Sequence, residues 1–118
     1  MTVNVLGTEY SIETVKYDKD PFFKETNTCA YHTGILRKIV LCDLNTIPGF
    51  EDEGHDYVEA QTKQALRHEI VHAFLYESGL DDNGAIPQIS WAKNEEMVDW
   101  IALQGTKLYK AWQEAGAL

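Results

Sequence analysis

Two histidines and a glutamate are spaced so that they could bind a metal ion and hydrolyse a bond. Residues 68–72 read HEIVH, which places His68 and His72 four positions apart with Glu69 directly after the first. On an α-helix of about 3.6 residues per turn, both imidazoles lie on one face and can hold the same cation. Glu69 is displaced by roughly 100° around the axis, where its carboxylate can act as a general base without being a ligand. The motif predicts metal-assisted hydrolysis.

A catalytic zinc site normally has three protein ligands and one open position for water, so the two histidines need a further partner. The downstream segment NEEMVDW supplies Glu95, which can reach the metal, and Asp99 one helical turn later. Asp99 can accept the free ring N–H of one histidine and so fix its tautomer. We therefore expect a Zn²⁺ ion held by His68, His72 and Glu95. Glu96 is the alternative third ligand, although it lies about 100° from Glu95 around the helix.

The same residues are also compatible with structures that do no catalysis. A chain with four histidines can contain this pattern by chance. It would then be an amphipathic helix whose two histidines are hydrogen-bonded in the core. A purely structural zinc ion, or no metal and an acidic docking surface, is a further alternative. Metal analysis of the purified protein separates these possibilities.

The sequence of the N-terminal third predicts β-strands that precede the HEIVH motif in the chain. Residues 2–15 alternate on both sides of Gly7-Thr8, which predicts a β-hairpin with a tight turn. The following segment contains Pro21 and clustered charges, and we expect a loop or short helical turn with its two phenylalanines against the core. Thr33-Gly34 separates two further apolar or alternating runs. They predict a second hairpin, whose longer arm is residues 35–42.

The rest of the chain predicts two helices. A Pro-Gly turn and an acidic cluster precede a helix that begins near Asp56 and stops at Gly79. Residues 80–90 form a predicted loop, after which Ser90 caps a last helix that runs to about Trp112. The predicted buried stripes are Ala65, Leu66, Val71, Phe74 and Leu75 in the first helix and Trp91, Val98, Ile101, Leu108 and Trp112 in the second.

Strands first and helices afterwards are typical of an α+β fold. We expect a small antiparallel or mixed sheet of two N-terminal hairpins, packed on the HExxH helix and a C-terminal helix. A chain of 118 residues is long enough for one compact core and too short for two. We therefore predict one domain over residues 1–118.

The charge balance excludes several classes of partner. Ten Lys and Arg against nineteen Asp and Glu give a net charge of −9, and such a surface repels phosphate backbones and anionic membranes. We expect no direct binding of nucleic acid or membrane. No apolar run approaches the roughly 20 residues that span a bilayer, and no signal peptide is recognisable. We therefore expect a cytoplasmic protein in which Cys29 and Cys42 are reduced thiols.

The segment HEIVH followed by NEEMVD resembles the gluzincin zinc metallopeptidases, whose pattern is HExxH followed by Glu with Asp four residues later. The resemblance covers about residues 35–104. The short link between the motifs is similar to that of the minimal ImmA/IrrE and SprT-like proteins of phages and mobile elements. This resemblance implies a minimal zincin-like fold and zinc-dependent hydrolysis of peptide bonds, with the ligand, base and outer-partner roles at the positions named above. It implies a protein or peptide substrate, including a regulatory protein as one candidate.

In the larger gluzincins a histidine or tyrosine from a long C-terminal domain stabilises the oxyanion, and we expect no counterpart of that domain within these 118 residues. Candidates for that role here are His55, Tyr31, His32 and Tyr109, and the sequence does not rank them. We expect an extended peptide to bind as an added strand alongside the arm at residues 35–42.

A second function is compatible with the same ligands. A zinc-binding interaction or regulatory module of a phage or prophage could keep the metal and use the peptide groove to hold a partner without turnover. All residues needed for hydrolysis are present, which favours an enzyme. A peptidase assay on zinc-loaded protein distinguishes the two functions.

Overall fold

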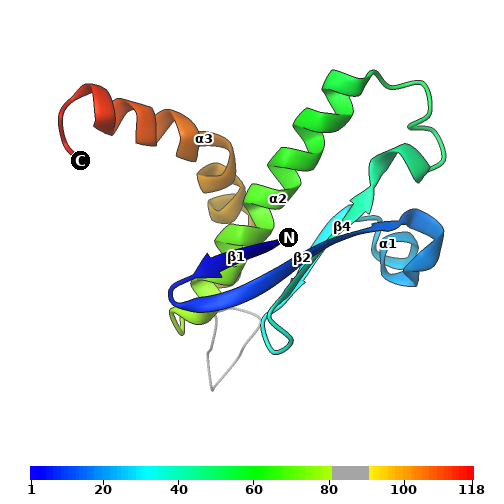
Figure 1. Cartoon of the computed structure of the whole chain (residues 1–118), viewed down its shortest axis with the longest axis horizontal. Helices are drawn as coiled ribbons and strands as arrows, with labels where there is room; N and C mark the ends of the chain where they lie inside the picture. The colour runs from blue at the N-terminus through cyan, green and yellow to red at the C-terminus, as the bar shows by residue number, and fades with distance from the viewer. Residues whose placement is uncertain (81–90) are drawn as a thin grey trace.

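The computed structural model describes residues 1–80 and 91–118 (Figure 1). Four strands form one sheet in the order β1-β2-β4-β3. Their bounds are β1 Thr2–Val5, β2 Thr8–Lys16, β3 Ala30–Thr33 and β4 Lys38–Asp43. The pairs β1/β2 and β3/β4 are antiparallel, whereas β2 and β4 are parallel. The predicted α+β class is confirmed, with two N-terminal hairpins joined into a mixed sheet.

The helices are α1 Pro21–Thr26, α2 His55–Glu77 and α3 Glu95–Glu114, with short 3-10 turns η1 Tyr17–Lys19, η2 Leu44–Thr46 and η4 Trp91–Lys93. Helix α2 lies across the sheet, and α3 packs against α2 and diverges from it (Figure 1). Helix α2 begins one residue before the predicted start and ends before Gly79. The φ of 83° at Gly79 is a left-handed conformation that glycine adopts readily. In the described ranges, no helix combines the length and apolar character needed to cross a bilayer.

The first hairpin turns one residue earlier than predicted. Val5 pairs with Thr8, so the two turn residues are Leu6 and Gly7 rather than Gly7-Thr8. Both have positive φ, 50° and 89°, which is the conformation of the two-residue turn that matches strand twist. Gly7 also donates its N–H to the Asn4 side chain at 2.9 Å.

The second hairpin has a longer turn than predicted. Strand β4 begins at Lys38, while Ile35 and Leu36 lie in the turn with 84% and 69% of their surface exposed. The predicted start of this arm is therefore wrong. The turn packs closely on α2, because a Cβ added at Gly34 would collide with the ring of Tyr76. This contact holds the end of β3 against the helix.

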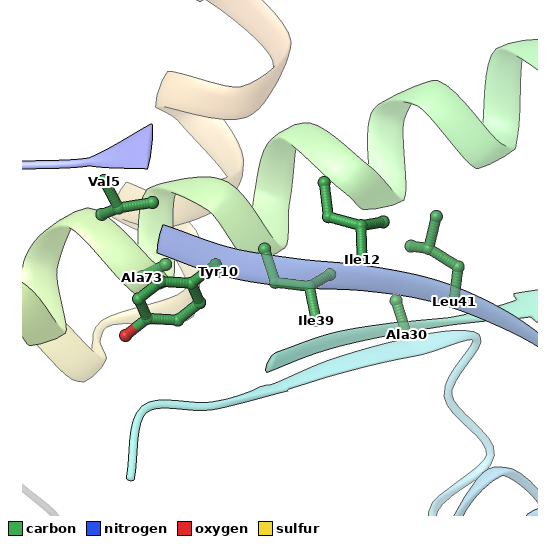
Figure 2. Close-up of a cluster of buried hydrophobic side chains, with 7 residues drawn as sticks. All are labelled: Val5, Tyr10, Ile12, Ala30, Ile39, Leu41 and Ala73. Carbon is green, nitrogen blue, oxygen red and sulfur yellow. The ribbon is translucent and has the colours of Figure 1, made fainter. Parts of the chain in front are cut away.

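One buried cluster joins the sheet to α2 (Figure 2). Its members are Val5, Tyr10, Ile12, Ala30, Ile39, Leu41 and Ala73. Alternate residues of β2 and β4 point toward the helix, as strand geometry requires. Burial of each large aliphatic side chain contributes about 1.5–3 kcal/mol. Because Ala73 is fully buried, this packing sets the rotation of α2 about its axis.

A second cluster covers the other face of β4. It consists of Phe23, Val40, Cys42, Leu44 and Val58. Strand β4 is thus buried on both faces, which explains the uninterrupted apolar run IVLC. The segment after Pro21 is helical, as one of the two predicted alternatives had it. Of its phenylalanines, Phe23 is buried and Phe22 is 38% exposed. Cys29 and Cys42 are free thiols, the first partly and the second fully buried.

Helix α3 differs from its prediction at its start. Ser90 and the predicted loop, except Leu80, lie outside the described residues. The α-helix begins at Glu95, and its cap is Asn94, whose side chain accepts the N–H of Met97 at 2.7 Å. An asparagine at this position satisfies a backbone donor that the helix itself leaves unpaired.

The buried stripes of the two long helices are also narrower than predicted. In α3, Val98 and Ala102 are buried, whereas Ile101, Leu108 and Trp112 are 38–46% exposed. Those three predictions are wrong. Leu108 and Trp112 belong to the C-terminal part of α3, which extends away from α2 (Figure 1), and Ile101 lines an open cavity together with residues of α2. The side chain of Trp91 lies outside the described part. In α2, the predicted apolar positions are half-buried except Phe74, which is 40% exposed.

Candidate metal centre

The HExxH residues lie on the part of α2 that faces the sheet. Glu69 and His72 are buried, and the side chain of His68 is 19% exposed. The centroids of the two histidine rings are 4.7 Å apart, as expected for neighbours one helical turn apart. The C-terminal turn of α2 is fastened to the sheet by Glu77, which accepts the hydroxyl of Tyr10 at 2.8 Å. The motif is therefore carried by a helix that is held in place by the core.

The first turn of α3 brings Glu95 to these histidines. One carboxylate oxygen, Oε2, lies 3.1 Å from Nε2 of His68, and the other, Oε1, lies 3.1 Å from Nε2 of His72. The two Nε2 atoms are also 3.1 Å apart. Glu96, the alternative ligand, instead lines a different cavity together with Trp100. The geometry thus favours Glu95 over Glu96.

Asp99 determines which atom of His68 carries a hydrogen. Its Oδ1 lies 2.7 Å from Nδ1 of His68. Because a carboxylate accepts hydrogen bonds, Nδ1 is assigned as the donor, and in a neutral ring Nε2 then carries the lone pair. That lone pair meets the carboxylate of Glu95 and Nε2 of His72. Electron-rich atoms at this distance repel one another unless a proton or a cation lies among them.

The donor set fits a zinc ion. Zinc prefers imidazole nitrogen and carboxylate oxygen among its ligands, at bond lengths of about 2.0–2.2 Å. Tetrahedral ligand atoms at that range are roughly 3.3 Å from one another. The Nε2 atoms of His68 and His72 are 3.1 Å apart, each lies 3.1 Å from a different oxygen of Glu95, and one ligand atom from each residue lies within 4.8 Å of the others. The candidate ligand atoms are therefore compatible with zinc in chemistry and in spacing.

Strand β3 contributes a residue that the sequence left unranked. Ala30 faces the α2 core, so alternation places His32 on the same face and Tyr31 on the other. The ring of His32 stacks on that of His72, with centroids 5.3 Å apart and planes at 4°. Its Nδ1 lies 3.7 Å from Oε2 of Glu69. Counting the alternation from Ala30 is the signal that could have selected His32.

The other three candidates for the oxyanion role are engaged or distant. Tyr31 lines a cavity together with His32 and Glu69, but its hydroxyl donates a hydrogen bond to Asp20 at 2.6 Å. Burial and that carboxylate raise the pKa of Tyr31 to about 12. His55 is exposed at the start of α2 and lies 3.5 Å from Glu59. Tyr109 lines a separate cavity between α2 and α3.

Of the two edge strands of the described sheet, β1 and β3, it is β3 that borders the candidate site. Strand β4 pairs with β2 on one side and β3 on the other, so the predicted docking arm at residues 35–42 has no free edge. This prediction is wrong because β4 lies inside the sheet. Strand β3 pairs with β4 alone in the sheet of the described residues, and its outer edge borders the cleft beside Glu69.

Two cavities meet at the candidate ligands. One has a volume of about 620 Å³ and the other about 390 Å³. Both are lined by Thr28, Ala30, His68, Glu69 and Glu95. The shared residues show that the two cavities adjoin at the candidate ligands, and we refer to them as the larger and the smaller arm of one cleft.

The comparisons with known proteins assign the chain to a family. The family model of BSP, described as peptidase of plants and bacteria, matches residues 7–117. The chain belongs to this family. The matched range begins before β2 and contains every predicted site residue. Membership of the BSP family agrees with the predicted peptidase class. No curated protein and no solved structure matches the chain.

Proposed function

We propose that this BSP family member is a zinc-dependent metallopeptidase of gluzincin type, with His68, His72 and Glu95 as the ligands. The observation that supports it is the convergence of these three side chains, from two helices, with mutual distances of 3.1 Å. A buried carboxylate, that of Glu69, adjoins them. When bound, zinc supplies Lewis acidity, because it polarises a substrate carbonyl and makes water acidic near neutral pH.

Glu69 is the residue that moves the proton in this proposal. It adjoins the ligands on α2 and lines both arms of the cleft, so a water and a scissile amide can reach it. Its carboxylate takes the proton of the attacking water and later gives it to the leaving amine nitrogen. The low exposure of the Glu69 side chain, 9%, excludes most competing solvent.

Two further residues, Asp99 and His32, lie beside the proposed ligands and base. Asp99 holds His68 in the tautomer whose Nε2 faces the other ligands. His32 enters the cleft from β3, stacked on His72 and close to Glu69. It is the best placed of the four candidates to donate a hydrogen bond to a developing oxyanion. A peptide bound along the outer edge of β3 would present its carbonyl to this group.

The test combines metal analysis with one substitution. Protein purified without chelator is expected to contain one zinc per chain and to cleave a peptide library, with the products identified by mass spectrometry. Glu69→Gln should retain the zinc and lose roughly 10²- to 10⁴-fold in cleavage rate, because the base is removed and the ligands are not. Glu96→Gln is the matched control on α3 and should cleave at the parent rate.

Three outcomes would contradict parts of the proposal. Cleavage by Glu69→Gln at the parent rate would exclude Glu69 as the base. A zinc-loaded protein that binds peptides but cleaves none would favour the alternative regulatory module. Protein that contains no zinc and binds none on titration would remove the metal site altogether.

A further inference from the structure

The larger arm of the cleft has a mainly apolar surface, to which Asn27 and Thr28 add polar groups. It extends from the candidate ligands along the N-terminal half of α2, with a volume of about 620 Å³. Its walls include Tyr17, Ile47 and Phe50 on one side and Ala65 of α2 on another. Gln61 and Gln64 line the same arm with their amides. No Lys or Arg is among the described residues that line it.

This apolar wall is held by the core. Tyr17, Ile47 and Phe50 are partly buried and pack against the second cluster, which contains Leu44 and Val58. Their remaining surface faces the arm. The wall is therefore the outer side of a packed cluster and does not need to form when a ligand enters. A preformed concave apolar surface is the usual character of a ligand pocket.

We propose that this arm binds one large apolar side chain of a peptide substrate, aromatic or long aliphatic, close to the scissile bond. The inference rests on the proposed function, because the arm opens directly onto His68, Glu69 and Glu95. Its volume accommodates any single natural side chain. Apolar side chains gain free energy by leaving water for such a surface.

Charged side chains lack a partner in the arm. An acidic side chain would meet the carboxylates of Glu69, Glu95 and Asp99 and no Lys or Arg of the described lining, and these carboxylates would offset the charge of a bound divalent ion. A basic side chain gains little, since Asp99 is already paired with His68 and the bound ion would offset Glu95 and the adjoining Glu69. Electrostatics thus favours the uncharged occupant.

Binding can be measured without turnover. Zinc-loaded Glu69→Gln protein is titrated with five-residue peptides, capped at both ends, that contain four alanines and one central residue. That central residue is Phe, Leu, Ala, Asp or Lys. Because the flanking alanines are identical, each peptide can slide until its central side chain reaches the arm. We expect the Phe and Leu peptides to bind roughly 10- to 100-fold more tightly than the Ala peptide. The Asp and Lys peptides should bind no more tightly than the Ala peptide.

A charge introduced into the arm should change this preference. Gln61→Arg, made in the Glu69→Gln protein, places a cation in the lining, and we expect the Asp peptide to gain at least about tenfold in affinity. Gln113→Arg is the matched control, because it makes the same change at the exposed end of α3. It should leave all five affinities unchanged. Circular dichroism checks that both variants are folded.

The outcomes separate this inference from the proposed function. Asp or Lys peptides that bind as tightly as the Phe peptide, or an unchanged preference in Gln61→Arg, would overturn the apolar arm. If the parent protein cleaves peptides with no preference for an apolar residue beside the scissile bond, the proposed peptidase activity is supported and the proposed role of the arm is contradicted. If the peptides bind with the expected preference while the parent protein cleaves none of them, the proposed role of the arm is supported and the proposed hydrolysis is contradicted.

Discussion

The two helices that build the candidate metal centre are supported very differently. On α2, the side chains of Glu69 and His72 are 9% and 11% exposed and lie against the sheet. On α3, the side chains of Glu95 and Asp99 are 64% and 55% exposed. The proposed base and two of the proposed ligands are therefore positioned by the hydrophobic core, whereas the proposed third ligand comes from a helix with a small buried contact.

Few interactions set the position of α3. Its buried residues in the described part are Val98 and Ala102. Arg67 of α2 donates from Nε to the carbonyl of Ala102 at 2.8 Å, and Asp99 contacts His68. A metal ion shared by both helices would add a further link between them. Metal binding should therefore stabilise the packing of α3 on α2.

Removing one proposed ligand from each of α2 and α3 should have the largest effect, and it tests whether the two helices are supported differently. We expect His72→Ala and Glu95→Ala each to weaken zinc binding by more than about 100-fold, since loss of an outer partner alone costs roughly 10- to 100-fold. In metal-free protein, only His72→Ala should lower the melting temperature appreciably, because His72 packs in the buried part and Glu95 does not. Isothermal titration and thermal unfolding measure the two effects.

Glu96→Ala is the control for the ligand series and should bind zinc like the parent. Parental zinc affinity in Glu95→Ala would show that α3 does not supply the third ligand. An equal fall in metal-free melting temperature for both ligand variants would show that the two sides are equally supported.

The next test compares one aliphatic truncation in each region. Ile39→Ala removes a fully buried side chain below α2 and should lower the free energy of unfolding by about 2–5 kcal/mol. Leu108→Ala removes a side chain that is 38% exposed on α3 and should cost less than about 1 kcal/mol. Urea unfolding followed by circular dichroism gives both values. Similar losses would mean that α3 is as well packed as the sheet and α2.

The sequence predicted local elements and the spacing of the site residues well. Period-two alternation marked both hairpins, and the helical period placed His68 and His72 on one face of α2. Glu95 lies within reach of both histidines, as the spacing within NEEMVDW indicated. These features depend on neighbours in the chain, which a sequence displays directly.

The features that the sequence could not predict depend on which strands pair and on which helix faces are covered by other elements. Strand β2 pairs in parallel with β4, and this order makes β3 the edge strand beside the site. Alternating residues do not specify which strands become neighbours, so the docking edge was misassigned and His32 was not ranked. The apolar spacing of Ile101, Leu108 and Trp112 marks one face of α3. It does not say whether any other element covers that face.

The substitution with the smallest expected effect on zinc binding tests the hydrogen bond that links α2 to α3. Arg67→Met removes the donor to Ala102 while keeping an unbranched, helix-favouring side chain. A hydrogen bond from a charged group contributes about 1.5 kcal/mol or more, so misplacement of Glu95 should weaken zinc binding by roughly tenfold. Lys110→Met, on the exposed part of α3, is the matched control and should leave the zinc affinity unchanged.

A double-mutant cycle shows whether Arg67 acts through α3. In a Glu95→Ala background the third ligand is absent, so its placement no longer matters and Arg67→Met should have little further effect on zinc affinity. A tenfold loss that persists in that background would mean that Arg67 acts on the neighbouring His68 instead. The hydrogen bond from Arg67 would then not be what positions Glu95, and other contacts of α3, among them those of Val98, Ala102 and Asp99, would have to hold it at the site.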